Sequence, residues 1–458
     1  MKVIICGAGQ VGYGIAERLA AEGNDVSVID TSPELVQRVN DMLDARGVLG
    51  HGSHPDTLVE AGARDADMLI AATLHDEVNM VACQIAHSLF DIPTKIARVR
   101  AQSYLKDEWR QLFAQEHMAI DVVISPEVEV GEMVLRRLNL PGAFETMSFG
   151  DGRISAVGVH CEDNCPIVDT PLRQLSELFP DLPVVIVAIV RNGRLLVPHG
   201  DDALKVGDDA YFVAPNEQVT RTLKICGHEE QHSRRVIIAS GGNIGYYVAN
   251  EIEKRLPQVR TKLVELNRQR ATEVAGLLPQ TVVLHGSALN EDLLREADIQ
   301  RADTMVALTN DDQVNILTCV LARQLGCPRN LCLINNPAYA TVVRSLGIGA
   351  QINPRTVTVS RVLQHVRRGR IRGVFSIHNG DAELIETEAL ETAPIVGRPM
   401  RDLNLPDGIR FGAILREGKV IIPTGSTELE AKDRAVVFAT AEHVRDVEQM
   451  FRVSLEYF

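Results

Sequence analysis

The chain passes from an apolar run into closely spaced glycines at Ile4-Ile5-Cys6-Gly7-Ala8-Gly9-Gln10-Val11-Gly12-Tyr13. It does so a second time at Ile237-Ile238-Ala239-Ser240-Gly241-Gly242-Asn243-Ile244-Gly245-Tyr246. The likeness continues downstream, where His51-Gly52-Ser53 is matched by His285-Gly286-Ser287. The first stretch begins at residue 4 and the second at residue 237, a period far longer than the about 20–50 residues of solenoid repeats. This period indicates the duplication of a multidomain unit.

The N-terminal part of each half alternates short apolar runs with stretches of helical periodicity. In the first half the runs are Val3-Ile4-Ile5, Val26-Ser27-Val28-Ile29, Met68-Leu69-Ile70-Ala71 and Lys95-Ile96-Ala97-Arg98-Val99. Short, nearly continuous apolar runs are typical of strands that are buried on both faces of a parallel sheet. The pattern therefore predicts an α/β fold with a doubly wound, Rossmann-like sheet over residues 1–125 and again over residues 233–353.

The C-terminal part of each half has a different pattern. Asn192-Gly193 separates two apolar runs and is a strong signal for a β-hairpin turn. Strand-like runs, such as residues 184–190, alternate with glycine and aspartate. We expect a small β-rich α+β domain over residues 143–227 and a second one over residues 371–455.

The composition argues against several classes of function. The net charge of −14 and the 4% of aromatic residues disfavour nucleic-acid binding, which needs a basic surface. No apolar run approaches the ~20 residues that span a membrane. The first strand begins at Lys2, so we expect no secretory signal. These observations predict a cytoplasmic protein.

Gly7, Gly9 and Gly12 have the spacing of the dinucleotide-binding fingerprint. They follow a strand and open a helix, and Asp30 ends the next predicted strand. Gly7 permits a tight turn, Gly9 lets a pyrophosphate approach the backbone, and Gly12 lets the helix pack closely on the strand. The helix N-terminus attracts the phosphates. Asp30 would accept hydrogen bonds from the ribose hydroxyls, and because it repels a 2′-phosphate we expect NAD(H) rather than NADP(H).

The second half departs from this pattern at its first glycine. Ser240 replaces Gly7, which strains a turn that needs positive φ, while Gly242, Gly245 and Glu265 are retained. We therefore expect a second nucleotide site that differs from the first. Further contacts are expected after the third and fourth strands, where ligands bind in open α/β sheets. These candidates are Gly52, Ser53 and Thr73 in the first half and Gly286, Ser287 and Thr309 in the second.

Arg98 is a further difference between the halves, because its counterpart is Leu333. The planar guanidinium of an arginine in the fifth strand could pair with phosphates, and a surface ion pair is the alternative interpretation. If Arg98 contacts the ligand, the two sites should differ in affinity or in the nucleotide that they prefer.

Two alternative functions remain open, a redox or metal sensor and an NAD-dependent oxidoreductase. Most of the eight cysteines lie in apolar surroundings typical of buried thiols, whereas Cys161 and Cys165 flank Glu162-Asp163-Asn164, which we interpret as a polar surface loop. A redox or metal sensor built on these two thiols is one alternative, but the second half has Ala389 and Ala393 there, and we predict no metal site. An NAD-dependent oxidoreductase is the other, but it needs a positioned proton donor near the nicotinamide, and neither half repeats one.

The tandem order of a Rossmann-like module and a small β-rich module resembles the TrkA family of potassium-uptake proteins. The modules of that family are called TrkA-N, or RCK for regulating conductance of K⁺, and TrkA-C. The resemblance covers essentially the whole chain and rests on residues 6–12, on Asp30 and on the duplicated strands that lead to Thr73 and Thr309. It implies a non-enzymatic cytoplasmic regulator that lies at the inner face of the cell membrane through a Trk-type potassium-transporter subunit. It also implies a homo-oligomeric ring of RCK modules that gates the transporter in response to a nucleotide.

The resemblance further implies NAD⁺ or NADH as the ligand, and because some relatives bind ATP or ADP, one site could take either of these. In the first half it assigns the contacts to Gly7, Ala8, Gly9, Gln10, Val11, Gly12, Asp30, Thr73, Leu74 and Arg98. In the second half it assigns them to Ser240, Gly241, Gly242, Asn243, Ile244, Gly245, Glu265, Thr309 and Asn310. Ser240 and Leu333 depart from the family pattern and make the second site the less certain of the two.

Overall fold

The computed structural model describes residues 1–140, 142–179, 181–228, 233–348, 350–366 and 371–452. The chain divides into two compact units. Unit 1 joins Met1–Val134 with Arg234–Val366, and unit 2 joins Leu135–Ser233 with Arg367–Phe458. Each unit therefore takes the corresponding part from both halves of the repeat. The expected end of the last domain, at residue 455, lies outside the described residues.

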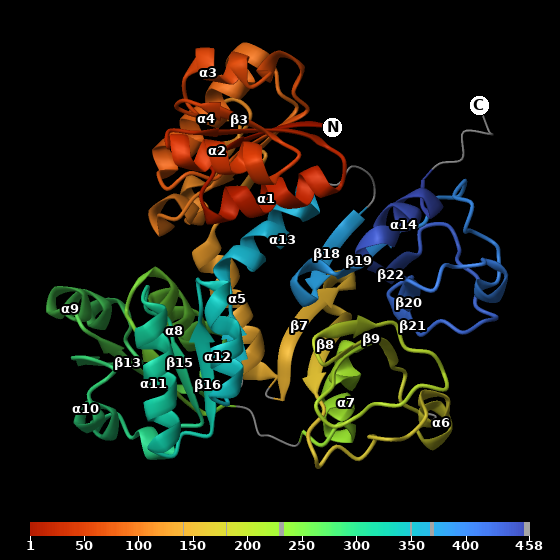
Figure 1. Cartoon of the computed structure of the whole chain (residues 1–458). Coiled ribbons are helices and arrows are strands. Elements are labelled where there is room, and N and C mark those ends of the chain that lie inside the picture. The colour runs from red at the N-terminus through yellow and green to blue at the C-terminus, as the bar shows by residue number, and fades with distance from the viewer. Residues whose placement is uncertain (141, 180, 229–232, 349, 367–370, 453–458) are drawn as a thin grey trace. The chain divides into compact units, whose positions relative to one another are not determined.

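A six-stranded parallel sheet forms the first part of unit 1, with the strand order β3-β2-β1-β4-β5-β6 (Figure 1). The strands are β1 Lys2–Cys6, β2 Asp25–Asp30, β3 Arg46–Leu49, β4 Met68–Ala71, β5 Thr94–Arg98 and β6 Val122–Ile124. The helices are α1 Gln10–Ala21, α2 Pro33–Met42, α3 Pro55–Glu60, α4 Asp76–Phe90 and α5 Pro126–Asn139. The strand order reverses between β1 and β4, which is where open α/β sheets bind ligands.

The second part of unit 1 repeats this sheet, with the order β14-β13-β12-β15-β16-β17. The strands are β12 Arg235–Ala239, β13 Arg260–Glu265, β14 Val282–His285, β15 Thr304–Ala307, β16 Arg329–Leu333 and β17 Ala350–Ile352. The helices are α8 Asn243–Arg255, α9 Arg268–Leu277, α10 Glu291–Glu296, α11 Asp312–Gln324, α12 Ala340–Ser345 and α13 Pro354–Val366. The predicted doubly wound fold is confirmed in both halves.

The central strand β1 is buried on both faces, as its continuous apolar run predicts. Ile5 packs in one core with Ile15 and Leu19 of α1. Ile4 and Cys6 point to a second core on the opposite face of the sheet. Two-sided burial explains why the run lacks the polar alternation of a half-exposed strand. Among the described residues, no helix is long and apolar enough to cross a membrane.

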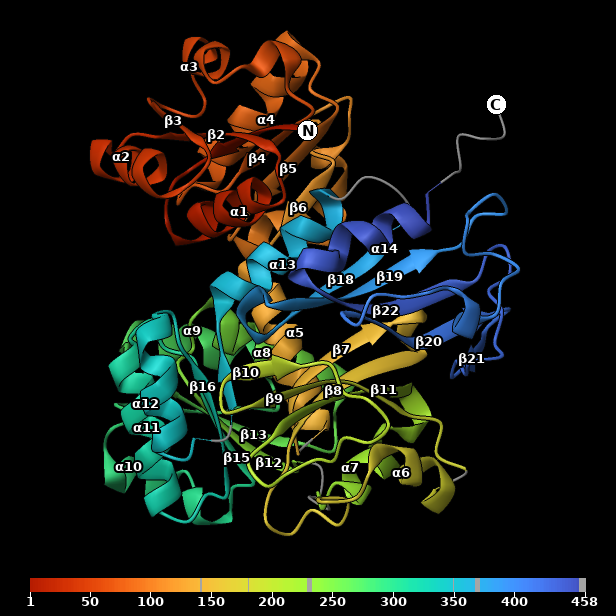
Figure 2. The same cartoon turned by 45° about the vertical axis from the view of Figure 1, so that its right-hand side comes forward.

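Helices α5 and α13 are exchanged between the two parts of unit 1. Val362, Leu363 and Val366 of α13 lie in the same hydrophobic core as α1 of the first part, and both views show α13 alongside α1 (Figures 1 and 2). In the other direction, Glu132 of α5 accepts a hydrogen bond of 2.8 Å from the Tyr247 hydroxyl of α8. The helix that ends each sheet therefore packs against the first helix of the other sheet.

Glycine permits close approach at both of these helix contacts. A Cβ atom at Gly14 of α1 would lie 2.8 Å from Nε of Arg355, and one at Gly131 of α5 would lie 2.3 Å from the Tyr247 ring. Arg355 also pairs with Glu17 at 3.4 Å. The sequence predicts a terminal helix near residues 127–138, but its contact with the other half depends on long-range packing that no local pattern contains.

Unit 2 contains two five-stranded antiparallel sheets of the same topology, in agreement with the predicted small β-rich domains. The first has the order β10-β9-β11-β8-β7, and the second has the order β21-β20-β22-β19-β18. The strands of the first are β7 Ala143–Phe149, β8 Ile154–His160, β9 Val185–Arg191, β10 Arg194–Leu196 and β11 Asp209–Pro215, with helices α6 Leu172–Leu178 and α7 Val219–Ile225. Those of the second are β18 Ile371–Ile377, β19 Ala382–Glu388, β20 Ile409–Arg416, β21 Lys419–Ile421 and β22 Arg434–Thr440, with helix α14 Val444–Met450. Side chains of both sheets share one hydrophobic core, which includes Phe149, Val213, Leu384 and Phe438.

The hairpin between β9 and β10 forms at Asn192-Gly193, as the sequence predicts. Both turn residues have positive φ, 52° at Asn192 and 74° at Gly193, which is the geometry of the tight turn that suits twisted strands. The second half uses Glu417 and Gly418 with φ of 48° and 80°. Glutamate tolerates this conformation less well than asparagine does, so the sequence signal for the turn is weaker in the second half.

An ion pair between an arginine and a buried aspartate is duplicated beside these hairpins. The Arg191 guanidinium donates two hydrogen bonds to Asp208, of 2.8 Å from Nε and 2.7 Å from Nη2. Arg416 makes the same pair with Asp433, at 2.9 Å and 2.7 Å. Both aspartates are only 1% exposed, and each also accepts a backbone N–H. Arg191 and Arg416, which occupy equivalent positions in the two halves, therefore have a structural role.

Replacing Asp208 with alanine should destabilise unit 2 by about 1–3 kcal/mol, because it leaves the Lys205 N–H and the Arg191 guanidinium without their shared acceptor. Urea unfolding followed by circular dichroism measures the change. Asp201→Ala is the matched control, since Asp201 pairs with Arg173 at 2.6 Å but is 80% exposed. That control should change stability by less than about 1 kcal/mol. Equal effects of the two substitutions would contradict the structural role of Asp208.

Candidate functional site

The glycine loop between β1 and α1 forms what we call the first cradle, which comprises residues 6–10, the start of α1 and Asp30. Gly7 has a φ of 107°, and its N–H donates a 2.7 Å hydrogen bond to the Ile29 carbonyl oxygen. A Cβ atom at Gly12 would lie 1.8 Å from the Gly7 carbonyl oxygen. A Cβ atom at Gly9, the N-cap of α1, would meet no atom within 4 Å. Gly12 is thus required by the fold and Gly7 is favoured by its positive φ, whereas Gly9 borders open space.

Asp30 lies directly beside this loop. One oxygen of its carboxylate accepts the Ala8 N–H at 2.7 Å, and the other accepts the Ser32 N–H at 2.8 Å. Each carboxylate oxygen has a second lone pair, so the group can still accept hydrogen bonds from two ribose hydroxyls. The two backbone donors fix the orientation of the carboxylate before any ligand arrives.

The second cradle comprises residues 239–243, the start of α8 and Glu265, and it repeats this backbone geometry. Ser240 has a φ of 96°, and its N–H donates to the Val264 carbonyl oxygen at 2.8 Å. A Cβ atom at Gly245 would lie 1.9 Å from the Ser240 carbonyl oxygen. Glu265 accepts the Gly241 N–H at 2.6 Å and the Asn267 N–H at 2.7 Å. The acidic residue therefore has the same relation to its loop as in the first half.

The remaining loop residues occupy the start of the first helix in each half. Gln10, Val11 and Gly12 begin α1, and Asn243, Ile244 and Gly245 begin α8. Neither helix has an acidic residue in its first turn or a side chain that caps it. The positive end of each helix dipole is thus left without an internal carboxylate, as an anion-binding helix end requires.

The threonines after the fourth strands are held by asparagines. Oδ1 of Asn79 accepts the Thr73 N–H at 2.9 Å and the Thr73 hydroxyl at 2.7 Å. Its Nδ2 donates to the Arg98 carbonyl oxygen at 2.9 Å, which links the ends of β4 and β5. Asn315 makes the same contacts with Thr309 and with the Leu333 carbonyl oxygen. The sequence repeats this asparagine six residues after each threonine, and that constant spacing is the signal that indicates a role.

Asp76 and Asp312 hold the next loop in the same way. Asp76 accepts the N–H groups of Arg100 and Ala101, at distances between 2.8 and 3.0 Å. Asp312 accepts the N–H groups of Asn335 and Asn336, each at 2.8 Å. The sequence also repeats these aspartates, and the structure assigns them to support of the strand ends.

The other predicted contacts lie at the same carboxyl edge of each sheet. The Gly52 carbonyl oxygen accepts the Cys6 thiol at 3.6 Å, so the loop after β3 crosses the end of β1. Ser53 lies in this loop and bonds His51 at 2.8 Å. Gly286 and Ser287 follow β14, and the Ser287 hydroxyl accepts the Leu289 N–H at 3.2 Å. Leu74 and Asn310 follow the two threonines, and Leu74 is 73% exposed.

Arg98 gives the first half a cation that the second half lacks. It ends β5, and its Nη1 donates to the Thr73 carbonyl oxygen at 3.4 Å. Its Nε is buried and has no hydrogen-bond partner among the described residues. Burial, together with the neighbouring Arg100, lowers the pKa of Arg98. Leu333, its counterpart, is buried and apolar.

Glu162, Asp163 and Asn164 are exposed, as the predicted polar surface loop requires, but Cys161 and Cys165 on either side of them are not. Both thiols are buried, as are the six other cysteines, and none forms a disulfide. Apolar neighbours in the first small domain, among them Ile167 and Leu223, surround them although the residues between them are polar. Hydrogen bonding between the two thiols lowers the pKa of Cys165. In the described part of the chain, no group of three or more His, Cys, Asp and Glu side chains is placed to hold a metal ion.

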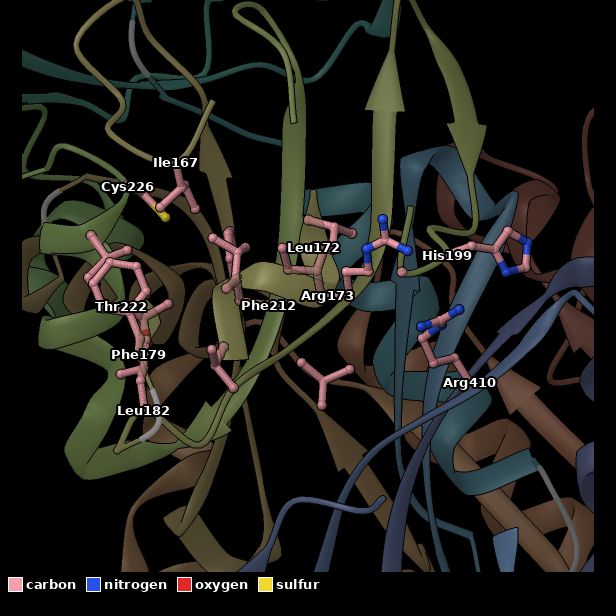
Figure 3. Close-up of a pocket in the computed structure, with 16 residues that line it drawn as sticks. Ile167, Leu172, Arg173, Phe179, Leu182, His199, Phe212, Thr222, Cys226 and Arg410 are labelled. Carbon is pink, nitrogen blue, oxygen red and sulfur yellow. The ribbon is translucent and has the colours of Figure 1, made fainter. Parts of the chain in front are cut away.

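A cavity of about 240 Å³ lies in unit 2, whereas both cradles belong to unit 1. Figure 3 shows Arg173, His199 and Arg410 at one end of it and Phe179 and Leu182 toward the other. The volume is below the roughly 300–1,000 Å³ of typical ligand sites. The cavity is therefore too small for a dinucleotide, and the open sheet edges in unit 1 carry the candidate site.

Comparison with known proteins identifies the modules. The family model of the TrkA-N domain matches residues 3–126 and 236–354, and that of the TrkA-C domain matches residues 159–227 and 384–452. The Trk system potassium uptake protein TrkA of Azorhizobium caulinodans is 61% identical over 458 residues, with both chains covered completely. The protein of the same name from Halomonas elongata is 41% identical over 462 residues, again with complete coverage of both.

Solved structures show the same fold. The GsuK RCK domain aligns with a TM-score of 0.61 at 17% identity, covering 98% of this chain and 94% of that one. The GsuK channel bound to NAD aligns with a TM-score of 0.60 at 18% identity, covering 98% of this chain and 78% of that one. The relatives described above are named for potassium uptake, in agreement with the expected non-enzymatic role. With both domain types matched twice and relatives aligned from end to end, the chain belongs to the TrkA family of potassium-uptake proteins.

Proposed function

We propose that the protein is a cytoplasmic, nucleotide-binding regulatory subunit of a Trk-type potassium-uptake system and that it binds NAD(H). The observation that carries this proposal is the first cradle, where Asp30 is oriented by two backbone N–H groups beside an unobstructed Gly9. The loop would bind the pyrophosphate, and Asp30 would bind the adenosine ribose. Membership of the potassium-uptake family supports the regulatory role.

The distal half of the nucleotide would lie toward the ends of β4 and β5. Thr73 and Leu74 border this region, and Arg98 supplies a cation. Asn79 binds the Thr73 hydroxyl and the Arg98 carbonyl oxygen, so it would position both residues without touching the ligand. In the second half Leu333 replaces the arginine, which makes that region less suited to a terminal phosphate. ATP or ADP would therefore bind preferentially at the first cradle.

Gating would act through the exchanged helices. Helix α5 follows β6, and its Glu132 contacts Tyr247 and Arg255 of α8, which begins at the second cradle. Helix α13 packs on α1, which begins at the first cradle. A nucleotide that binds one arrangement of these helices more tightly shifts the population toward it. A homo-oligomeric ring of such chains would transmit the shift to the membrane subunit of the transporter.

NADH should bind the purified protein at least about 30-fold more tightly than NADPH, because the 2′-phosphate of NADPH would meet the Asp30 carboxylate. Isothermal titration calorimetry with the two nucleotides measures the ratio. The Asp30→Asn variant should lower the NADH-to-NADPH affinity ratio, since the amide keeps an oxygen for one of the two backbone N–H groups but removes the charge. Equal affinities in the wild-type protein, or no binding of any adenine nucleotide, would contradict the proposal.

Co-purification tests the partner. The protein should be retained by a Trk-type potassium-transporter membrane subunit in detergent, and the retained amount should change when NADH is added. An oxidoreductase instead predicts turnover, seen as a loss of NADH absorbance with a substrate. Sustained turnover without association would overturn the regulatory role.

A further inference from the structure

The two cradles differ most clearly at the first residue of the glycine loop. Gly9 and Gly242, the helix N-caps, have nearly the same backbone angles, with φ of −63° and −61° and ψ of −176° in both. The acidic residues also make equivalent contacts. Against this common frame, the second loop carries the side chain of Ser240 where the first has only Gly7. Ser240 is therefore a difference between the two loops at the place where a pyrophosphate would bind.

Ser240 is held in a conformation that serine rarely adopts. Its φ of 96° lies in the region that favours glycine. The constraint comes from the fold, because the Ser240 N–H bonds β13 and its carbonyl oxygen faces the helix at Gly245. A strained residue that is maintained beside a binding loop suggests a role for its side chain.

The Ser240 hydroxyl occupies the hydrogen-bonding position that a phosphate would use. Its Oγ accepts the Gly242 N–H at 3.1 Å. The same oxygen would lie 3.2 Å from a Cβ atom placed on Gly242, so it borders the space above the loop. In the first cradle, no described residue accepts the corresponding Gly9 N–H, and the space above Gly9 is open. The second cradle thus contains an internal acceptor at its phosphate-binding N–H group.

The N–H and the carbonyl oxygen of Gly241 are also engaged. The Gly241 N–H donates to Glu265, and the Gly241 carbonyl oxygen accepts Nε of Arg270 at 2.8 Å. The Arg270 guanidinium lies 5.8 Å from the ring centre of Tyr246, and it pairs with Glu273 at 2.8 Å. An incoming phosphate would find the Gly242 N–H as its natural donor on this loop, and that donor is already paired.

We propose that the Ser240 hydroxyl is a built-in competitor for the nucleotide pyrophosphate and makes the second cradle the weaker, conditional site. This inference rests on the proposed nucleotide-binding function and assigns a specificity-determining role to one residue of it. A ligand must displace the hydroxyl from the Gly242 N–H, whereas at the first cradle it displaces only solvent. The second site would then fill only at nucleotide concentrations several-fold above those that fill the first.

Two substitutions separate the hydroxyl from the backbone strain. Ser240→Ala removes the hydroxyl but keeps a Cβ atom at positive φ, and Ser240→Gly removes both. Each should tighten nucleotide binding at the second cradle by about three- to tenfold, the range expected when one competing neutral hydrogen bond is lost. Only the glycine variant should also raise the unfolding temperature, because only it relieves the strain.

The measurement is calorimetric titration of the full chain with NADH and, separately, with ADP. Each Ser240 variant is compared with wild type in a Gly9→Ala background, in which the first cradle is blocked.

Tighter nucleotide binding in both variants supports the proposal. Weakening by Ser240→Ala would overturn it, because the hydroxyl would then donate to the bound phosphate. Equal affinities in all three proteins, or no second-site binding in any, would also overturn it. Failure of the proposed function is a separate result, namely no nucleotide binding to the chain with Gly9 intact.

Discussion

Replacing Gly12 with alanine is expected to destabilise unit 1 by about 3 kcal/mol and to abolish nucleotide binding at the first cradle. The new Cβ atom would lie 1.8 Å from the Gly7 carbonyl oxygen, far inside van der Waals contact. The Gly7 backbone cannot retreat easily, since its N–H bonds Ile29 and its other side faces the Ala72 carbonyl oxygen. The helix must therefore move away from β1. Urea unfolding measures the stability loss, and calorimetric titration with NADH measures the binding loss.

The repeat supplies a second copy of this experiment. Gly245→Ala places its Cβ atom 1.9 Å from the Ser240 carbonyl oxygen. This variant should lower the free energy of unfolding by about the same amount as Gly12→Ala. Gly62→Ala would be a poor comparison because Gly62 has a φ of 93°, which penalises any side chain. Stability within about 0.5 kcal/mol of wild type for Gly12→Ala would show that the loop is not packed as described.

Replacing Gly9 with alanine should weaken nucleotide binding with little effect on stability. Gly9 has a φ of −63°, and its added methyl would meet no protein atom within 4 Å. The free energy of unfolding should change by less than about 1 kcal/mol, the usual scale of a glycine-to-alanine change at an N-cap. NADH affinity at the first cradle should fall at least about 30-fold, since the methyl fills the space through which a pyrophosphate approaches the backbone.

The comparison of these two glycines is the sharpest test of the proposed site. Both variants should lose first-cradle binding, but only Gly12→Ala should lose stability. Wild-type NADH affinity in Gly9→Ala would mean that the ligand does not pass over this loop. Binding at the second cradle should persist in Gly9→Ala, and it provides the internal control that the preparation is active.

Local patterns predicted much of the fold. The apolar run of β1 is buried on both faces because β1 is a central strand, between β2 and β4, and helices such as α1 and α4 cover the two faces of the sheet. Asn192-Gly193 predicted a hairpin because only a few residue types accept positive φ in succession. These features depend on residues that are close in sequence, and for that reason sequence alone was sufficient to infer them.

The features that the sequence did not predict depend on contacts between residues that are far apart in the chain. Cys161 and Cys165 are buried by residues of other elements, although the segment between them is polar. The exchange of α5 and α13 joins residues more than a hundred positions apart, such as Glu132 and Tyr247. At the candidate site, the fingerprint indicated the glycines and the acidic residues, but it could not indicate that Asn79 holds Thr73 or that Ser240 pairs with Gly242. These details depend on side-chain rotamers, which spacing does not encode.

The exchanged helices also have a consequence for concentration dependence. Because α5 and α13 belong to one polypeptide, the pairing of the two nucleotide-binding modules is an intramolecular event. Two separate chains would lose such a pairing on dilution, whereas tethered modules keep a fixed and high effective concentration of one another. Communication between the two cradles within a single chain should therefore be independent of protein abundance, and only the assembly of chains into larger complexes should follow mass action.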